Sequence, residues 1–278
     1  MSDAGSPFEP AKLQRAEGTL HVAFRWRDGT TVLDTLHQAG CLKARFPRRI
    51  AGEWPEVIML NTSGGVAAGD RLLAQFVAAR NTRLTITAQA AERFYRARCE
   101  ERPAVVDYRI KVEPGAAAEW LPQEAIFFDD AAVSRRLEVE LAADSEFLGV
   151  EMLVFGRALM GETVRRVRLR DRIHITHNGR ALLFDSIRIE GNAAALLARR
   201  CIAGGMPSVA TLVYVAADAA VRLPAVRDAL ERAEAGASAE EGLLVARILA
   251  PCGAALRRSV ESTLFALRDR PLPRVWLC

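Results

Sequence analysis

The sequence has few side chains that bind transition metals tightly. Its 278 residues include four histidines and five cysteines, and no two cysteines form a Cys-x-x-Cys pair. Because the cysteines are odd in number and far apart, a disulfide scaffold is excluded and a reducing compartment is favoured. Only His174 and His177 lie close together, and on a strand residues three apart point to opposite faces. We therefore expect no tight metal chelate, and we interpret both histidines as structural or surface residues.

Long apolar runs are also missing. No run approaches the roughly 20 residues of a membrane span, and the first residues, MSDAGSPFEPAKLQ, lack the apolar region of a signal peptide. We therefore expect a cytoplasmic protein without a membrane partner. Apolar residues make up 50% of the chain and charged residues 26%, which is too apolar for a disordered chain, so the sequence predicts a folded protein.

Lysine is scarce, and the positive charge is nearly all arginine. Among 38 basic residues the lysines are Lys12, Lys43 and Lys111, and the net charge is +4. The densest basic run contains Arg165, Arg166, Arg168, Arg170 and Arg172. Because alternate residues of a strand share one face, we interpret this run as the solvated side of a strand. Basic residues are otherwise dispersed, and no aromatic residues for base stacking accompany the run, so we expect no nucleic-acid partner.

Alternation of apolar and polar residues dominates the first three quarters of the chain and predicts strands. Segment 19–27 alternates throughout, Asp28-Gly29 supplies a turn, and 30–36 continues as a second strand, so these residues predict a β-hairpin. Further segments of this kind are 57–61, 71–79, 83–88, 105–113, 117–121, 136–141, 146–155, 164–176, 180–189 and 208–215. The turn signals between them are spaced as in an antiparallel all-β protein.

Helical patterns are concentrated towards the end of the chain. Segment 223–235 has Pro224 near its start, 253–268 carries an apolar stripe at helical spacing, and a shorter helix about 192–199 would use Asn192 as its cap. Segment 235–241 predicts a loop. With no repeat or linker, we expect a flexible segment over 1–18 and one domain over 19–278. The predicted fold is mainly β, a single extended β-stack or β-helical domain with two or three helices, chiefly near the C-terminus.

The most distinctive segment is a glycine-rich turn that follows the apolar run 57–60. It contains Gly64, Gly65 and Gly69. A phosphate-binding loop of the Walker type needs a lysine and a serine or threonine after its last glycine. Here Asp70 and Arg71 stand there, and an aspartate would repel a triphosphate. We therefore interpret the segment as a tight turn and not as a nucleotide site.

Signals for catalysis are weak. Ser63 lacks the Gly-x-Ser-x-Gly pattern of a nucleophile elbow, and no cysteine stands in surroundings that would plainly lower its pKa. Several carboxylates are near one another in sequence: Asp129 with Asp130, Glu119 with Glu124, and Glu151 with Glu162. Such pairs leave open an alternative function, a small-molecule-binding or hydrolytic β-rich protein that uses a carboxylate pair.

Five blocks in a fixed order resemble the urease accessory protein D family (UreD, also called UreH). They are LNTSGGVAAGDRL at 60–72, AQAAERFYRA at 88–97, WLPQEAIFFDDAAV at 120–133, EMLVFGRALMGE at 151–162 and PRVW at 273–276. The blocks span nearly the whole chain. Departures are small: Cys41-Leu42 stands where the family commonly has Pro-Leu, and 61–63 reads Asn-Thr-Ser where His-Pro-Pro is frequent.

This resemblance implies a mainly β protein without a reaction of its own. Members of the family bind the urease apoenzyme and the accessory proteins F and G, of which G is the GTPase, and together they deliver nickel to the buried urease site. By resemblance, the chain is not an enzyme, binds no cofactor tightly, carries nickel only in transit and leaves GTP to its partner. The family also implies an internal tunnel for nickel, and the helix over 253–268 could dock accessory protein F or simply cap the strands.

A divalent ion that crosses a protein needs weak, successive oxygen ligands, because strong histidine or cysteine chelation would trap it. The candidate tunnel or transfer residues are Asp70, Glu92, Glu124, Glu151 and Glu162, each of which could instead be an ordinary surface or hydrogen-bonded carboxylate. The candidate turn-shaping residues are Gly64, Gly65, Gly69, Gly156 and Gly161. The candidate packing or interface anchors are Trp120, Arg157 and Trp276.

Overall fold

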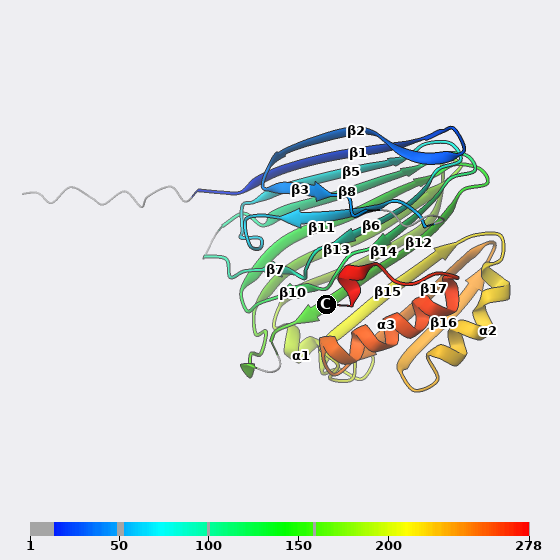
Figure 1. Cartoon of the computed structure of the whole chain (residues 1–278). Helices are drawn as coiled ribbons and strands as arrows, with labels where there is room; N and C mark the ends of the chain where they lie inside the picture. The colour runs from blue at the N-terminus through cyan, green and yellow to red at the C-terminus, as the bar shows by residue number, and fades with distance from the viewer. Residues whose placement is uncertain (1–13, 49–52, 99–100, 158–159, 278) are drawn as a thin grey trace, which may run out of the picture.

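A computed structural model describes residues 14–48, 53–98, 101–157 and 160–277. Over this part the chain is mainly β with three α-helices, as predicted. The strands form two sheets (Figure 1). The first sheet has the order β14 (Arg180–Gly191), β13 (Val167–His177), β11 (Ala131–Leu141), β8 (Ala104–Val112), β5 (Arg71–Ala78), β1 (Glu17–Arg27), β2 (Thr30–Gly40).

The second sheet contains the remaining strands. Its order is β16 (Glu234–Glu240), β17 (Leu243–Ala250), β15 (Ser208–Val215), β12 (Glu146–Phe155), β9 (Ala117–Leu121), β6 (Arg83–Ala88), β4 (Glu56–Asn61), β3 (Leu42–Arg45). Two short strands, β7 (Glu92–Phe94) and β10 (Ala125–Phe127), pair with each other, and β10 also pairs with β12. The sequence patterns did not predict β3, β7, β10, β16 or β17.

From β5 to β13 the chain passes alternately through the two sheets, as in a β-helix. Successive passes lie side by side, so β5, β8, β11 and β13 run parallel, and so do β6, β9 and β12. The expected antiparallel arrangement is therefore wrong for the centre of both sheets and holds only at their margins. A turn signal such as Pro114-Gly115 shows that the chain reverses. It does not show whether the next strand pairs beside the last one or joins the opposite sheet.

The predicted hairpin between β1 and β2 is confirmed. Asp28 and Gly29 both have positive φ, 49° and 77°, which is the two-residue turn that suits twisted strands. Most of the N-terminal segment expected to be flexible, 1–18, lies outside the described residues. Its last part is ordered by contacts: the Ala16 amide donates a hydrogen bond to Asp70 over 2.8 Å, and β1 already begins at Glu17.

Two apolar cores fill the space between the two sheets and between the second sheet and the C-terminal helices. The inner core lies between the sheets and includes Leu20, Phe76, Tyr108, Trp120, Leu137, Phe147 and Ile173. Trp120 is fully buried there, with ring centroids of Tyr108 and Phe76 at 4.8 and 6.1 Å. The outer core lies between the second sheet and the C-terminal helices and includes Leu121, Val150, Leu212, Val226, Ile248, Leu256, Val260, Leu264 and Trp276. Strands β9 and β12 thus contribute side chains to both cores.

Helices α2 and α3 cover the outer face of the second sheet near β15, β16 and β17 (Figure 1). Helix α1 (Ala193–Leu197) is capped by Asn192, and α3 (Gly253–Leu267) buries its apolar stripe, both as predicted. Helix α2 (Ala219–Ala229) begins four residues earlier than expected, with Pro224 inside it. The predicted loop at 235–241 is wrong, because strand β16 forms there by pairing with β17. No helix in the described ranges is long and apolar enough to cross a bilayer.

Candidate functional site

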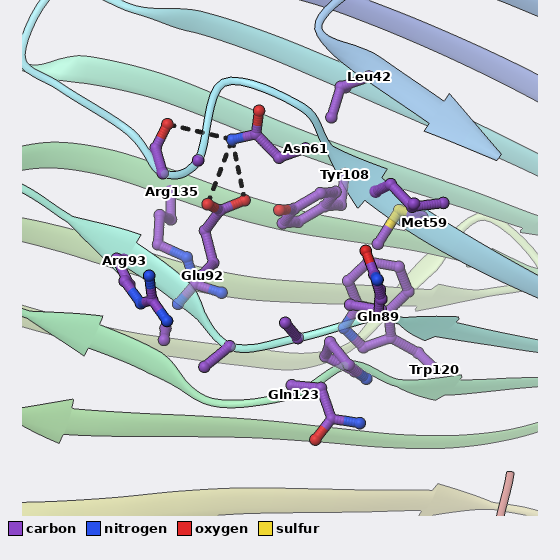
Figure 2. Close-up of a pocket in the computed structure, with 18 residues that line it drawn as sticks. Leu42, Met59, Asn61, Gln89, Glu92, Arg93, Tyr108, Trp120, Gln123 and Arg135 are labelled. Atoms are coloured by element: carbon purple, nitrogen blue, oxygen red, sulfur yellow. Dashed lines mark hydrogen bonds between the residues drawn. The ribbon is translucent and has the colours of Figure 1, made fainter. Parts of the chain in front are cut away.

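A pocket of about 180 Å³ lies where the parallel strands β4, β6 and β9 end (Figure 2). Polar residues follow each strand: Asn61 ends β4, Gln89 comes directly after β6, and Gln123 comes two residues after β9. The carboxyl ends of parallel strands meet at one edge of a sheet, which is why residues so far apart in sequence share one pocket. Met59 and Trp120 supply apolar wall.

Glu92 is the acidic residue of this pocket. Asn61 Nδ2 donates to both of its carboxylate oxygens, over 3.2 and 3.3 Å, and also to the carbonyl of Gly65 over 3.2 Å (Figure 2). Burial raises the pKa of Glu92 to about 7, although the Asn61 hydrogen bond and the charge of Arg135 oppose the rise. At neutral pH both the protonated and the ionised form of this carboxyl group are therefore populated.

The glycine-rich turn holds the strand that carries Glu92. The Val66 amide donates to the carbonyl of Arg93 over 2.8 Å, and the Tyr95 hydroxyl donates to the carbonyl of Gly64 over 2.8 Å. A Cβ atom on Gly65 would lie 2.4 Å from the Tyr95 ring, and the φ of this residue is 147°. Only glycine fits so close to Arg93 and Tyr95, so the turn fixes the position of the strand that carries Glu92.

A buried ionic cluster begins at the inner wall of the pocket. Arg135, on β11, lines the pocket and extends between the sheets. Its guanidinium is 2.5 Å from Glu151 of β12 and 3.1 Å from Asp171 of β13. The other oxygen of Glu151 accepts a hydrogen bond from Trp120 Nε1 over 2.7 Å. These three charged residues are at most 7% exposed, in a core that is otherwise apolar.

The cluster continues towards the opposite edge of the sheets. Burial raises the pKa of Asp171, although Arg135 opposes the rise, and the negative charge of Asp185 on β14 adds to it. Asp185 in turn pairs with Arg247 of β17 over 2.8 Å. We call this row the polar seam: Glu92, Arg135, Glu151, Asp171, Asp185 and Arg247. It leads from the pocket beside β7 to strands β14 and β17.

The polar seam offers oxygen ligands in succession and no closed cage. Nowhere in the described part of the chain do three histidine, cysteine, aspartate or glutamate side chains come together as a metal site. Carboxylates spaced in this way could supply a divalent cation with one or two oxygen ligands at a time.

The other predicted carboxylates lie outside the polar seam. Asp70 accepts hydrogen bonds from the amides of Ala16 and Ala67, both over 2.8 Å, and so closes the glycine-rich turn. Glu124 is held by the Arg257 guanidinium, over 2.8 and 3.0 Å. Of the five carboxylates singled out in the sequence, the structure brings only Glu92 and Glu151 into the seam.

Glu162 belongs to a surface turn. Its carboxylate accepts from Arg157 Nε over 2.8 Å and from the Asp129 amide over 3.3 Å. Burial would raise the pKa of Glu162, but these hydrogen bonds outweigh it and lower the pKa. Arg157 also lies over the Phe128 ring, 4.4 Å from its centroid, and its side chain is about half exposed. This pair therefore orders the turn.

The predicted glycines all have positive φ. The values are 79° for Gly64, 147° for Gly65, 87° for Gly69, 82° for Gly156 and 67° for Gly161. Of the predicted anchors, Trp120 is in the inner core. Trp276 is 3% exposed, and its Nε1 donates to the carbonyl of Leu121 over 3.0 Å, which ties the end of the chain to β9.

The carboxylate pairs considered as a catalytic alternative do not meet. Asp129 accepts hydrogen bonds from the amides of Arg165 and Arg166; burial would raise its pKa, but these bonds lower it, which is unsuitable for a general acid. Asp130 pairs with the Arg166 side chain over 2.6 Å. Glu119 pairs with Arg268 and Arg270, whereas Glu124 pairs with Arg257. Glu151 pairs with Arg135, whereas Glu162 pairs with Arg157.

Sequence reasoning missed Arg135, Asp171, Asp185 and Arg247. A signal for the first two was present. Arg135 stands between Val133 and Leu137 on the inward face of its strand, and Asp171 stands likewise on β13. A charged residue in an otherwise apolar alternation indicates a buried charge that needs a partner.

The comparisons with known proteins agree with the family resemblance that the five sequence blocks indicate. The model of the family described as "UreD urease accessory protein" matches residues 16–277. A urease accessory protein UreD of Xanthobacter autotrophicus is 42% identical, over 96% of this chain and 92% of that protein. Those of Methylobacterium sp. (strain 4-46) and Rhizobium leguminosarum bv. trifolii are each 41% identical, over 99% and 95% of this chain and 99% and 96% of those proteins. The chain therefore belongs to the UreD family of urease accessory proteins.

Proposed function

We propose that this protein is a non-catalytic scaffold of urease maturation in the cytoplasm. It binds the urease apoenzyme and accessory proteins F and G, and it helps to pass nickel towards the urease active site. Membership of the family supports the accessory role. The single observation that supports nickel passage is the polar seam, in which Glu151 and Asp171 are buried in the apolar inner core and Glu92 and Asp185 are partly exposed on either side of them.

Charge balance in the polar seam favours a cation as its cargo. Four carboxylates face two arginines, so full ionisation leaves the seam two negative charges in excess. Uncompensated charge is costly in a protein interior. Protons relieve it in the resting protein, as the raised pKa values of Glu92 and Asp171 indicate. A divalent cation would relieve the same excess by displacing two protons.

The hydrogen bonds of the glycine-rich turn support the proposal that a partner, and not this chain, binds GTP. A phosphate loop uses its free backbone amides to hold the phosphates. Here the Ala67 amide already donates to Asp70, and the Val66 amide donates to Arg93. Nickel remains cargo in this proposal, and no cofactor is bound tightly.

The test is co-expression with the urease subunits and accessory proteins F and G, followed by pull-down and metal analysis of the purified urease. Glu151→Gln keeps the shape of the side chain and removes one seam charge. We expect a several-fold loss of urease nickel while the complex still assembles, because the path loses a ligand.

Glu119→Gln is the matched control. Glu119 is as buried as Glu151 and lies on the neighbouring strand of the same sheet, but it faces the outer core. Its neutralisation should leave the nickel content of urease near the wild-type value in whatever complex is recovered. Equal nickel contents for Glu151→Gln and the wild type would exclude passage along the seam. Failure of the wild-type protein to co-purify with urease would contradict the scaffold role separately.

A further inference from the structure

The densest arginine run lies on the outer face of the first sheet. Arg168, Arg170 and Arg172 alternate along β13 and point away from the inner core. In the register of the sheet, Arg188 of β14 stands directly opposite Arg170. We call Arg168, Arg170, Arg172 and Arg188 the arginine face. The solvated side of a strand that the sequence predicts is therefore a cluster shared by two strands.

Part of this positive charge is not neutralised. Arg188 pairs with Glu190 over 2.8 Å, and Arg168 donates to the carbonyl of Glu101 over 2.7 Å. Arg170 and Arg172 form no ion pair with any residue in the described ranges. The register places Arg170 directly beside Arg188, and like charges opposite one another destabilise a sheet.

Arg172 also has an arginine beside it. In the register between β11 and β13, Arg136 stands opposite Arg172. Arg136 is already neutralised by Asp107 and Glu138, at 3.1 and 3.0 Å. Arg172 forms no ion pair with those two acids, and its Nε is buried without a hydrogen-bond acceptor. The exposed charge that the chain itself does not neutralise is therefore chiefly that of Arg170, beside the partly exposed Arg172.

We propose that the arginine face docks an acidic segment of a partner protein. Guanidinium groups bind carboxylates through paired hydrogen bonds, so added carboxylates would relieve the repulsion between Arg170 and Arg188. Neighbouring strands lie about 4.8 Å apart, and alternate residues of one strand about 6.7 Å apart. Carboxylates one helical turn apart, or on alternate residues of an extended segment, have comparable spacing.

A protein partner fits this face better than a nucleic acid. Glu190 and Glu138 lie among the arginines and would repel an unbroken row of phosphates, whereas a protein segment can place uncharged residues opposite them. Phe184 of β14, opposite His174, is 66% exposed and offers an apolar anchor of the kind found in protein interfaces. Because β14 is the edge strand of the first sheet, a partner can also approach from the side.

The test measures binding of a short fluorescent peptide that is rich in glutamate and carries one phenylalanine, by fluorescence anisotropy with the full chain. Arg170→Glu combined with Arg172→Glu should weaken binding about tenfold at low salt, since two attractive contacts become repulsive. The matched control is Arg232→Glu combined with Arg258→Glu, which changes the net charge equally at exposed sites elsewhere. The control should change affinity by no more than about twofold.

Two further measurements keep the proposal open to contradiction. Arg170→Lys combined with Arg172→Lys keeps the charge and should retain most of the peptide affinity, and it serves as the folded variant if charge reversal perturbs the sheet. An oligothymidylate and anionic lipid vesicles are the competing probes. Equal losses in the face and control variants would overturn the proposal, and so would tighter binding of either probe than of the peptide. Nickel takes no part in these measurements, so their outcome does not decide the proposed transfer along the polar seam.

Discussion

Glu119 and Glu151 are two buried carboxylates on neighbouring strands of one sheet, and they differ in what surrounds them. Glu119 faces the outer core and accepts from the Arg268 guanidinium over 2.7 and 3.0 Å and from Arg270 over 2.5 Å. The Thr85 hydroxyl donates to it as well, over 2.7 Å. Two cations thus surround one anion, and the cluster ties the residues that follow α3 to β9.

Glu151 has the opposite balance. It shares the single guanidinium of Arg135 with Asp171, and Glu92 stands at the pocket end of the same cluster. One cation thus serves several anions, and the row opens into a pocket. The comparison teaches that a buried carboxylate stabilises the fold where cations outnumber it. Where carboxylates are in excess, burial raises their pKa, as it does for Glu92 and Asp171.

The substitution Glu119→Ala tests this comparison most directly and should have the largest effect on stability. It leaves the buried Arg268 and the partly exposed Arg270 without their anion, so we expect a loss of about 3–5 kcal/mol in the free energy of unfolding. Denaturant unfolding of the purified protein measures it. Thr85→Val removes only one neutral donor to the same carboxylate and should cost about 1 kcal/mol.

Replacing all three charged residues of the outer cluster with methionine should recover most of that loss, because buried ion pairs gain little over apolar packing. A loss below about 1 kcal/mol for Glu119→Ala would show that the cluster does not hold the C-terminal segment.

Glu92→Gln tests the polar seam, where carboxylates are in excess. We expect it to raise the free energy of unfolding, whereas Glu119→Ala lowers it. Burial raises the pKa of Glu92 from 4.5 to about 7. The folded pKa lies above the unfolded value, so this group's favourable contribution is complete below pH 4.5 and is lost as the pH rises through about 7. Glutamine resembles the protonated form, so the variant should be more stable than the wild type at pH 8 by about 2 kcal/mol, after allowance for solvent in the pocket.

The internal control is the pH itself. At pH values below 4.5 the two proteins carry the same charge at this position, and their stabilities should converge. Unfolding curves for both proteins at pH 4 and pH 8 make the measurement. A gain of equal size at both values would point to packing, and a loss at pH 8 would mean that the carboxylate is satisfied as fully as Glu119.

Much of the strand pattern could be predicted from sequence, because period-two alternation is local. The predicted segments 83–88, 117–121, 146–155 and 208–215 coincide with β6, β9, β12 and β15. Strand β16 escaped prediction because its small residues, Glu-Ala-Gly-Ala-Ser-Ala-Glu, carry no strand propensity, and it forms by pairing with β17. The parallel order escaped because it depends on which sheet each strand joins, and that is decided over long distances in the chain.

For the same reason, the residues of the candidate site could be predicted only in part from the sequence. Glu92 and Glu151 stand in blocks that resemble the family, so the sequence singled them out. Their cationic partner Arg135 comes from a different strand, and Asp171 from the next one. Only the coiling of the chain through both sheets brings these strands together, and no spacing in the sequence records it. Inward charges among apolar neighbours are the signal that a second pass along the sequence can use.

The smallest expected effect on stability comes from substitution of Glu162. This carboxylate lies outside both cores and can be compared with the two buried carboxylates. Its pKa is lowered, because hydrogen bonds from Arg157 and the Asp129 amide outweigh partial burial. A lowered pKa contributes stability above pH 4.5 that is lost as the pH falls through the folded value, the reverse of Glu92. Glu162→Gln should therefore lower the melting temperature by less than about 2 °C at pH 7, and the difference should vanish in acid. Differential scanning calorimetry at both pH values measures this, and a larger loss would place the turn after β12 among the elements that hold the two sheets together.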